Sequence, residues 1–240
     1  MLREKGHDVA AHAHNLNDTP AVLSLFETAC GLDPPRTASG YNVWFKEGGD
    51  ALAKAWSAEV QQLVTQGIRV GTTSIAPDET GHHDMAPTCT TTWGEGNTSW
   101  SQGTDNLMFP WKPDYANNRP CDHDPEGQFV LIDHTVPEWV VGSGGKADTL
   151  RTEHFDQLKT RLQAALEYMD KEQPERIAVW GLVTHITEYM VGSKADNGPN
   201  EEALQALDSF LDFVDQQVSA GRMVYSTPEN LAAELFPEVL

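Results

Sequence analysis

The chain has 240 residues, of which 36 are acidic and 16 are basic, so its formal net charge is −20 at pH 7. This charge disfavours nucleic acid and anionic membranes as partners, because both would be repelled. No apolar run approaches the roughly 18 residues that a membrane span needs, and residues 1–8 lack the apolar core of a signal peptide. The compartment is unknown from the sequence, and as written the chain is expected to be cytoplasmic.

Short β-like runs alternate with amphipathic helical segments along most of the chain. Strands are expected at 7–12, 36–41, 67–75, 128–133, 176–185 and 223–226. Helices are expected to begin at Thr19, Asp50, about Thr149, Asn200 and Thr227, mostly at residues that favour the N-cap position. The run 176–185 is the most apolar of all, which predicts a central strand covered on both faces.

The four longer helices each carry an apolar stripe at helical spacing, which we expect to face a core. The principal members of the stripes, in chain order, are Val22, Leu25, Phe26 and Ala29; Leu52, Ala55, Trp56, Val60, Leu63 and Val64; Phe155, Leu158, Leu162, Leu166 and Met169; and Leu204, Leu207, Leu211, Val214 and Val218. These stripes predict which side of each helix is buried.

Strands that alternate with long helices indicate an α/β fold with a mostly parallel sheet. About six parallel strands with outer helices are expected over a single domain at 1–240, as an incomplete or distorted (β/α) barrel or an open doubly wound sheet. Residues 76–127 interrupt the pattern, with Trp93, Trp100 and Trp111 among polar residues. Because long structureless loops are uncommon in compact domains, this insertion is expected to be ordered, as a structural flap or a substrate-binding wall.

Reactive side chains of parallel β/α folds gather at the carboxyl ends of the strands. The predicted strand ends supply the candidate site residues His12, His14, Arg36, Tyr41, Asp133, His134 and His185. Four of the nine histidines of the chain are in this set. This convergence is the strongest functional signal in the sequence.

Histidines 12 and 14 are two residues apart, so on a regular strand their side chains would point to the same side. Both could then bind one metal ion, since imidazole is a common ligand for zinc and related ions. A third ligand is needed, and Asp133, His134 and His185 are candidates by position. In the alternative, one histidine orders the loop and the other is solvated.

Other reaction classes find little support in the sequence. The chain has no G-x-G-x-x-G or Walker motif for a nucleotide and no G-x-S-x-G segment for a serine nucleophile. Cys30, Cys89 and Cys121 form no C-x-x-C pair, which disfavours a structural zinc site and a disulfide framework. No spacing of carboxylates points to glycoside hydrolysis.

Three segments resemble motifs of NodB-type polysaccharide deacetylases. Residues 6–14, G-H-D-V-A-A-H-A-H, are similar to the family's second motif, G-H-E-[IV]-x-x-H, which ends in metal-binding histidines. A strand ending in V-x-H at 183–185, then a helix, then V-Y-S-T-P-E-N-L-A at 224–232, resembles the family's last motif and its terminal strand and helix. The R-T-A-S-G segment at 36–40 falls where the family places its arginine motif.

The resemblance implies a distorted β/α barrel that hydrolyses an N-acetyl or O-acetyl group on a carbohydrate. It implies a divalent metal, usually zinc, held by one Asp and two His, which polarises the acyl carbonyl and a bound water. It also implies an Asp as base and a late histidine as acid. Carried over by position, His12 is a metal ligand, His14 stands in for the second one, His185 is the general acid and Arg36 orients the base. Tyr41, Asp133 and His134 are then candidates for contacts with the saccharide.

The chain departs from the family pattern at two places. Leu16 stands where the family's H-x-x-x-H pair would have its second histidine. The family's Asp-Asp motif precedes the G-H-E segment, whereas only five residues precede Gly6 here. We therefore expect either a sequence that lacks an upstream segment or a relative that has lost this motif.

Two functions remain open at this point. The first is a metal-dependent deacetylase-like hydrolase. The second is an inactive or truncated relative that binds a saccharide or a protein through the tryptophan-containing insertion, because indole rings stack on sugar faces. If an opening strand is missing, the exposed sheet edge predicts a homodimer or aggregation.

Overall fold

The computed structural model describes residues 10–12, 18–39, 50–72, 107–132, 151–181, 189–191 and 197–240. They belong to two compact units, whereas a single domain was expected from the sequence. The sheet unit comprises the described residues of Met1–Thr98, Met108–His134 and Ser226–Leu240. The helix-pair unit comprises those of Ser99–Leu107 and Thr135–Tyr225.

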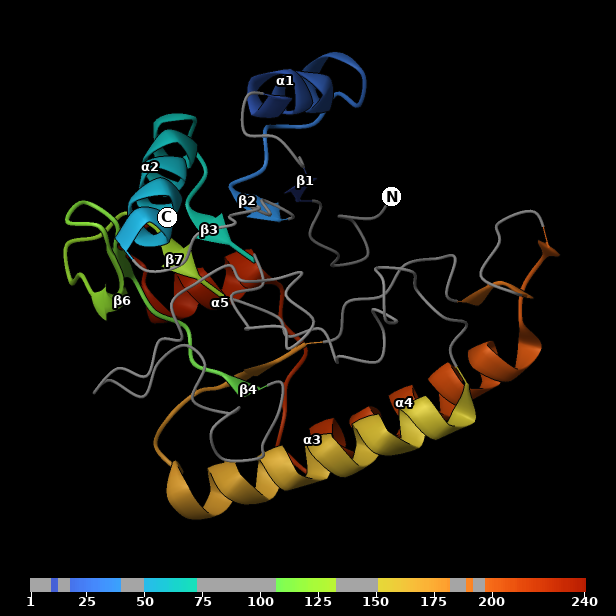
Figure 1. Ribbon diagram of the computed structural model, residues 1–240. Coiled ribbons are helices and arrows are strands. Elements are labelled where there is room, and N and C mark those ends of the chain that lie inside the picture. Colours follow the sequence, from blue (N-terminus) through green and yellow to red (C-terminus); the bar gives the residue numbers. More distant parts are fainter. Residues whose placement is uncertain are drawn as a thin grey trace. The chain divides into compact units, whose positions relative to one another are not determined.

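The sheet unit is built on four short parallel strands (Figure 1). In sheet order they are β1 (Ala11–His12), β2 (Thr37–Ser39), β3 (Val70–Gly71) and β7 (Val130–Leu131). Helix α1 (Thr19–Thr28) lies between β1 and β2 in the chain, and α2 (Asp50–Thr65) lies between β2 and β3. The mixed helix and strand composition and the parallel pairing agree with the expected α/β class.

The order of the four strands across the sheet is the same as their order in the chain. Because parallel crossovers are almost always right-handed, such an order places successive connecting helices on one face of the sheet. That arrangement is typical of barrels, whereas a doubly wound sheet reverses its direction at a switch point. Closure into a barrel stays a prediction.

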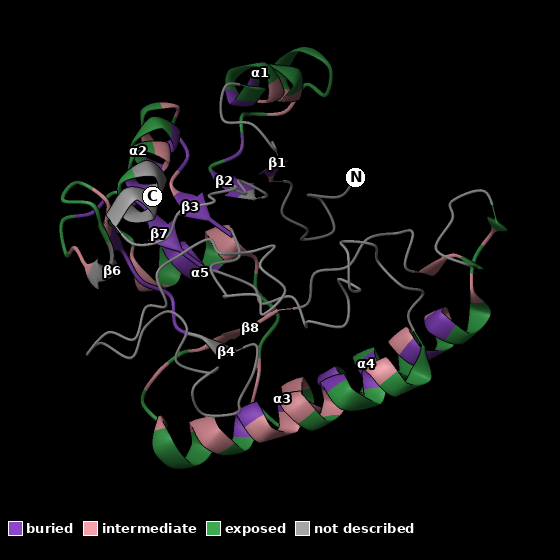
Figure 2. Ribbon diagram, viewed as in Figure 1, coloured by how far each residue is buried: buried purple, intermediate pink, exposed green. Residues whose placement is uncertain are grey.

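The core of the sheet unit lies along the strands. Ala11, Ala38, Val70 and Val130 are fully buried, and Figure 2 shows β2, β3 and β7 as buried. A Cβ atom on Gly71 would lie 2.5 Å from the ring atom Cζ of Phe129, so only glycine fits there without a shift of the ring. The aromatic ring of Phe129 therefore packs directly over the backbone of β3.

The last part of the insertion is ordered, as expected. It contains β4 (Leu107–Met108) and a hairpin of β5 (Pro113–Asp114) and β6 (Arg119–His123), whose turn places Asn118 at a φ of 58°. Trp111 is 2% exposed and pairs with Leu131 of β7 through an antiparallel bridge. Trp111 thus anchors the segment as predicted, while Trp93 and Trp100 lie outside the described residues.

Helices of the sheet unit follow their predicted boundaries more closely than their predicted faces. In α2, Val60 and Leu63 are buried as expected. In α1 the buried residues are Thr19 and Leu23, while Leu25 is 56% exposed, so its predicted stripe is wrong by a rotation of the helix. Helix α5 (Pro228–Leu235) begins at Thr227, whose Oγ1 accepts the Asn230 N–H, and it contacts β3.

The helix-pair unit consists mainly of α3 (Thr152–Glu172) and α4 (Glu201–Ser219), which lie side by side (Figure 1). Thr152 Oγ1 donates to Glu202 Oε1 at 3.3 Å, Lys159 Nζ to Ser209 Oγ at 2.8 Å, and Arg222 NH2 to Asp170 Oδ2 at 2.6 Å. The earlier residues of α3 meet the earlier residues of α4, so the helices are parallel.

The interface between α3 and α4 is apolar. Phe155, Leu158 and Leu162 of α3 are buried as predicted. On α4 Val214 is buried as predicted, and the other buried residues are Ala203, Ala206 and Phe210. The buried face is therefore displaced from the predicted stripe, whose Leu207 and Val218 pack at its margin and whose Leu211 is 42% exposed. The ring of Phe210 lies 6.0 Å from that of Phe155 and 5.7 Å from that of Trp180, between centroids. These ring contacts select the face of α4 that is buried.

Two predicted strands differ from the structure. The run 176–185 is described as far as Gly181, and only β8 (Val179–Trp180) is a strand there. It is half-buried and outside the parallel sheet, so the expected central position is wrong for these residues. Residues 223–226 form no strand, and Val224 and Tyr225 are 81% and 61% exposed.

Candidate functional site

His12 lies at the carboxyl edge of the parallel sheet, as predicted. It is the last residue of β1 and pairs in register with Ser39, the last residue of β2. The same edge continues through Thr72, whose N–H donates to Ala38 O at 2.9 Å, and Ile132, whose N–H donates to Gly71 O at 2.9 Å. The ends of four strands therefore meet at one edge that begins with a histidine.

The other residues expected at this edge lie outside the described residues. They are His14, Tyr41, Asp133, His134 and His185. Asp133 and His134 follow Ile132 directly in the sequence, immediately after the buried end of β7. No group of three His, Cys, Asp or Glu within the described ranges could hold a metal ion. Because four of the five candidate ligands are outside those ranges, this finding does not bear on the expected metal site.

Arg36 lies at the opposite edge of the sheet from His12. It precedes β2, and its carbonyl oxygen accepts the N–H groups of Arg69 and Val70, at 2.8 and 3.0 Å. The three residues of β2 separate the two edges by about 10 Å along the strand direction. Its expected position at a carboxyl strand end is thus wrong. The role of orienting a base beside the metal remains a prediction that this position does not support.

An open pocket lies at the amino edge, where Arg36 is found. Its volume is about 440 Å³, and its lining residues are Arg36, Gly67, Arg69, Gln128, Glu238, Val239 and Leu240. Arg36 NH1 donates to Leu240 O at 2.6 Å, and Arg69 NH1 donates to Val64 O at 2.7 Å and Ile68 O at 3.1 Å. Two guanidinium groups therefore stand at the amino ends of neighbouring strands.

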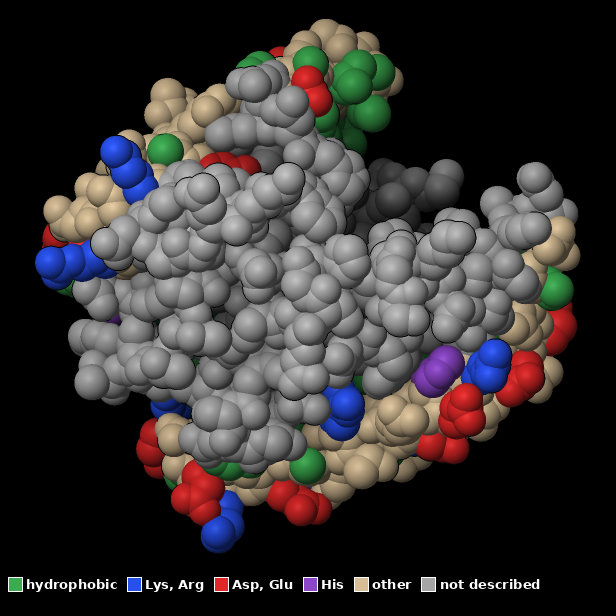
Figure 3. Space-filling view, in the orientation of Figure 1, with side chains coloured by type: hydrophobic (Ala, Val, Ile, Leu, Met, Phe, Trp, Pro, Cys, Tyr) green, Lys and Arg blue, Asp and Glu red, His purple; other side chains and the backbone are tan. Residues whose placement is uncertain are grey.

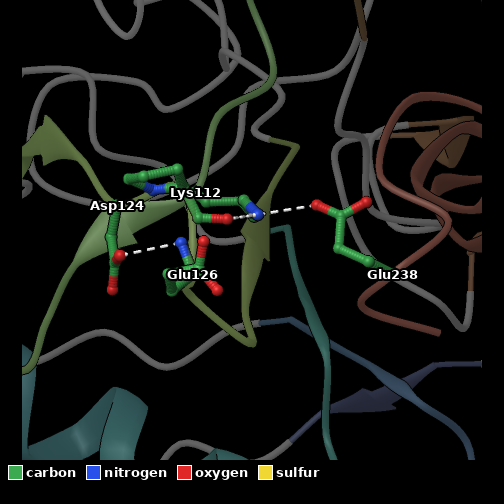
Figure 4. Close-up of polar contacts among 5 residues, drawn as sticks. Lys112, Asp124, Glu126 and Glu238 are labelled. Atoms are coloured by element: carbon green, nitrogen blue, oxygen red, sulfur yellow. Dashed lines mark hydrogen bonds and ion pairs between the residues drawn. The ribbon is translucent and has the colours of Figure 1, made fainter.

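A buried lysine lies beside this pocket (Figure 4). Lys112 is 3% exposed, and its Nζ donates to the carbonyl oxygen of Pro125 and to Glu238 Oε1, the latter at 2.6 Å. Asp124 supports the same loop, because its Oδ1 accepts the Glu126 N–H at 3.0 Å. The hydrogen bond and charge of Lys112 lower the pKa of Glu238. This network ties the loop before β7 to residues 236–240.

Glu59 on α2 is the most strongly shifted carboxyl group among the described residues. Burial raises its pKa from 4.5 to about 8, because desolvation disfavours the charged form. The hydroxyl of Ser57, two residues earlier, is buried without a hydrogen-bond partner. Sequence analysis missed Glu59, although apolar residues four positions away on both sides, Ala55 and Leu63, were a signal that it lies on a buried face.

Trp111 and Trp180 each pack against other side chains of their own unit. Trp111 is 2% exposed and packs inside the sheet unit. Trp180 is half-buried and packs against Phe210 in the helix-pair unit. These two residues therefore serve as core anchors.

No family model matches the chain, and no curated protein or solved structure matches it either. The resemblance to NodB-type deacetylases therefore remains a prediction from the motifs. Within the described part of the chain, no helix is both long enough and apolar enough to span a membrane.

Proposed function

We propose that the chain is a metal-dependent hydrolase of the polysaccharide deacetylase type, which removes acetyl groups from a saccharide. The observation that supports the proposal best is the position of His12 at the carboxyl edge of a sheet with the strand order of a singly wound β/α fold. In such folds the reacting groups come from this edge. Two imidazoles with a carboxylate or a third imidazole form a donor set that suits zinc.

In this proposal His12 and His14 hold the metal, and the third ligand comes from Asp133, His134 or His185. A bound divalent metal would polarise the acyl carbonyl and lower the pKa of a bound water. His185, when it is not a ligand, gives a proton to the leaving nitrogen or oxygen of the saccharide. Water supplies the new oxygen of the released acetate, so atoms and charge balance. Tyr41 and the strand-end residues that do not bind the metal contact the sugar.

The metal content of the purified chain tests this proposal first. We expect about one equivalent of zinc or a similar ion by mass spectrometry, as one three-ligand site requires. The double variant His12→Ala, His14→Ala should lose it. The matched control is His82→Ala, His83→Ala, which removes two adjacent histidines that no predicted strand end contains. A chain that takes up no metal even after soaking, or a control that loses the metal equally, would contradict the proposal.

Acetyl release from acetylated saccharides tests the catalytic step separately. We expect His185→Ala to keep its metal and lose acetyl release if this histidine is the acid. If the variant loses both, His185 is the third ligand. A chain that binds metal and releases no acetate from N-acetyl or O-acetyl saccharides would overturn the substrate class.

We also propose that β1 supports self-association, because it is the outermost strand of the parallel sheet among the described residues. The outermost strand on the other side of the sheet, β7, is different, because Trp111 pairs with it. An unpaired edge is a template for another chain. Light scattering should show a homodimer or larger species, and a clean monomer in dilute buffer would contradict this part of the proposal.

A further inference from the structure

We propose that the pocket at the amino edge of the parallel sheet binds a small oxyanion, a phosphate or carboxylate group, between Arg36 and Arg69. The hydrolase proposed above uses the opposite edge, so this would be a second and separate site. The pocket has a volume of about 440 Å³, which is within the usual range of small-molecule sites.

Strand register brings the two arginines together. Thr37 pairs with Val70, and the residues immediately before them are Arg36 and Arg69. The Val70 N–H donates to Arg36 O at 3.0 Å, in the same pattern as Thr72 N–H to Ala38 O at 2.9 Å, so the parallel ladder extends to these positions. Residues opposite each other in a parallel pair project to the same side of the sheet. Both guanidinium groups accordingly line one pocket.

The charge balance of the pocket favours an anion. Like charges on directly opposite strand positions destabilise a sheet, unless a counter-charge lies between them. Glu238 is the one side-chain carboxylate among the lining residues, and it is already paired with Lys112 at 2.6 Å. Arg36 NH1 bonds an oxygen of Leu240, the last residue of the sequence, at 2.6 Å, whereas among the described residues Arg69 bonds only the backbone carbonyls of Val64 and Ile68. Arg69 therefore carries the main unbalanced positive charge of the pocket.

The guanidinium groups keep donors for a ligand. Each carries five N–H donors in a planar fork that matches carboxylate and phosphate oxygens. Backbone oxygens of Val64 and Ile68 accept from NH1 of Arg69, and the backbone oxygen of Leu240 accepts from NH1 of Arg36. These contacts hold the two side chains in place and leave the remaining N–H groups available to an oxyanion.

Titration of the full chain with inorganic phosphate, followed by two-dimensional NMR at constant ionic strength, tests this inference. We expect saturable shifts at the amides of Gly67, Gln128 and Val239, which line the pocket. Arg36→Gln or Arg69→Gln should weaken binding about tenfold to a hundredfold, the usual effect of removing a hydrogen bond to a charged group. Acetate in a parallel titration distinguishes a carboxylate preference from a phosphate preference, and saturable binding of either supports the site.

The control is Arg151→Gln, which removes an exposed arginine of the helix-pair unit. It changes the net charge equally and should leave the affinity unchanged. If Arg69→Gln fails to fold because α2 loses its terminal contacts, Arg36→Gln carries the test, since this side chain is exposed. Shifts that do not saturate, or an equal loss of affinity in Arg151→Gln, would overturn the inference. Metal content is measured independently of this titration, so the two proposals can fail separately.

Discussion

Different kinds of contact stabilise the helix-pair unit and the sheet unit internally. In the helix-pair unit, two helices of 21 and 19 residues bury one continuous apolar seam. In the sheet unit, the parallel strands have two or three residues each, and segments distant in sequence hold them in place. Lys112 and Glu238, for example, are 126 residues apart.

Polar groups are also distributed differently in the two units. Helix α4 carries five carboxylates and no basic residue, and all five are exposed. Figure 3 shows acidic side chains along the surface of the helix pair. The sheet unit instead buries Lys112 and shifts the pKa of Glu59. The stability of the helix-pair unit should therefore depend mainly on its apolar contacts. The stability of the sheet unit should also depend on pH and on close packing of side chains against the backbone.

The largest effect is expected from Phe210→Ala in the helix-pair unit. Phe210 is 3% exposed and contacts both Phe155 and Trp180. Its loss should lower the free energy of unfolding by about 3–5 kcal/mol, through lost burial and a cavity. Urea unfolding followed by circular dichroism measures the change.

The neighbouring residue supplies a matched control. Leu211 is 42% exposed, and Leu211→Ala should cost less than about 1 kcal/mol. An equal cost for the two variants would contradict the burial of Phe210 in preference to Leu211.

The next effect is a pH dependence at Glu59 in the sheet unit. Its pKa is about 8 in the folded chain against an ordinary value of 4.5. Between these values the folded state binds a proton that the unfolded state lacks. The free energy of unfolding should therefore fall as pH rises, by at most about 1.4 kcal/mol per pH unit.

Glu59→Gln should remove this dependence and make the chain more stable than the wild type at pH 8, with no difference near pH 4. Urea unfolding at several pH values measures the effect. Asp212→Asn, on the exposed surface of α4, should leave the pH profile of the wild type unchanged. Parallel profiles for the wild type and Glu59→Gln would show that this carboxyl group is solvated.

A smaller effect is expected from Gly71→Ala. The added Cβ would lie 2.5 Å from Phe129 Cζ, and such overpacking typically costs about 1–3 kcal/mol. Phe129→Leu removes the clashing ring, so the double variant should lose less stability than the two single variants together. Strict additivity in a thermal unfolding cycle would mean that the two positions do not touch.

The contrast between the units explains what could be predicted from the sequence. The starts of α4 and α5 follow from Asn200 and Thr227, because a cap is a local interaction. The buried face of α4 was displaced, because two stripes at helical spacing overlap there and only packing against α3 selects between them. Residues 223–226 have β-favouring side chains, but strand formation needs a partner that local sequence does not specify.

In the candidate site, too, local features were predictable and long-range contacts were not. His12 was placed at the correct edge, because a histidine at the end of a β-like run needs only the strand direction. Arg36 was placed at the wrong edge, although the predicted strand began at this residue, which puts it at the amino end of that strand. Lys112 was missed because its partners are the loop carbonyl of Pro125 and the distant Glu238. Local sequence patterns do not predict contacts between segments that are distant in the sequence.

The smallest effects are expected at the two helix caps, one in each unit. Asn200 Oδ1 accepts the N–H groups of Glu202 and Ala203, at 3.1 and 3.4 Å, and Thr227 Oγ1 accepts that of Asn230 at 3.2 Å. Asn200→Ala and Thr227→Ala should each cost about 1 kcal/mol.

Amide hydrogen exchange distinguishes the two caps, because each loss should appear first in the helix that the residue caps. Asn200→Ala should speed exchange at Glu202 and Ala203, whose donors lose their acceptor, and Thr227→Ala should do so at Asn230. A cap acts only on the first turn of its own helix. Faster exchange throughout both units in either variant would therefore contradict the separation of the sheet unit from the helix-pair unit. Helix α4 also buries four residues of the apolar seam along its length. The rest of α4 should therefore keep its protection when Asn200 is replaced, whereas in α5, which has eight residues, the first turn is about half of the helix, so a larger share of it should lose protection.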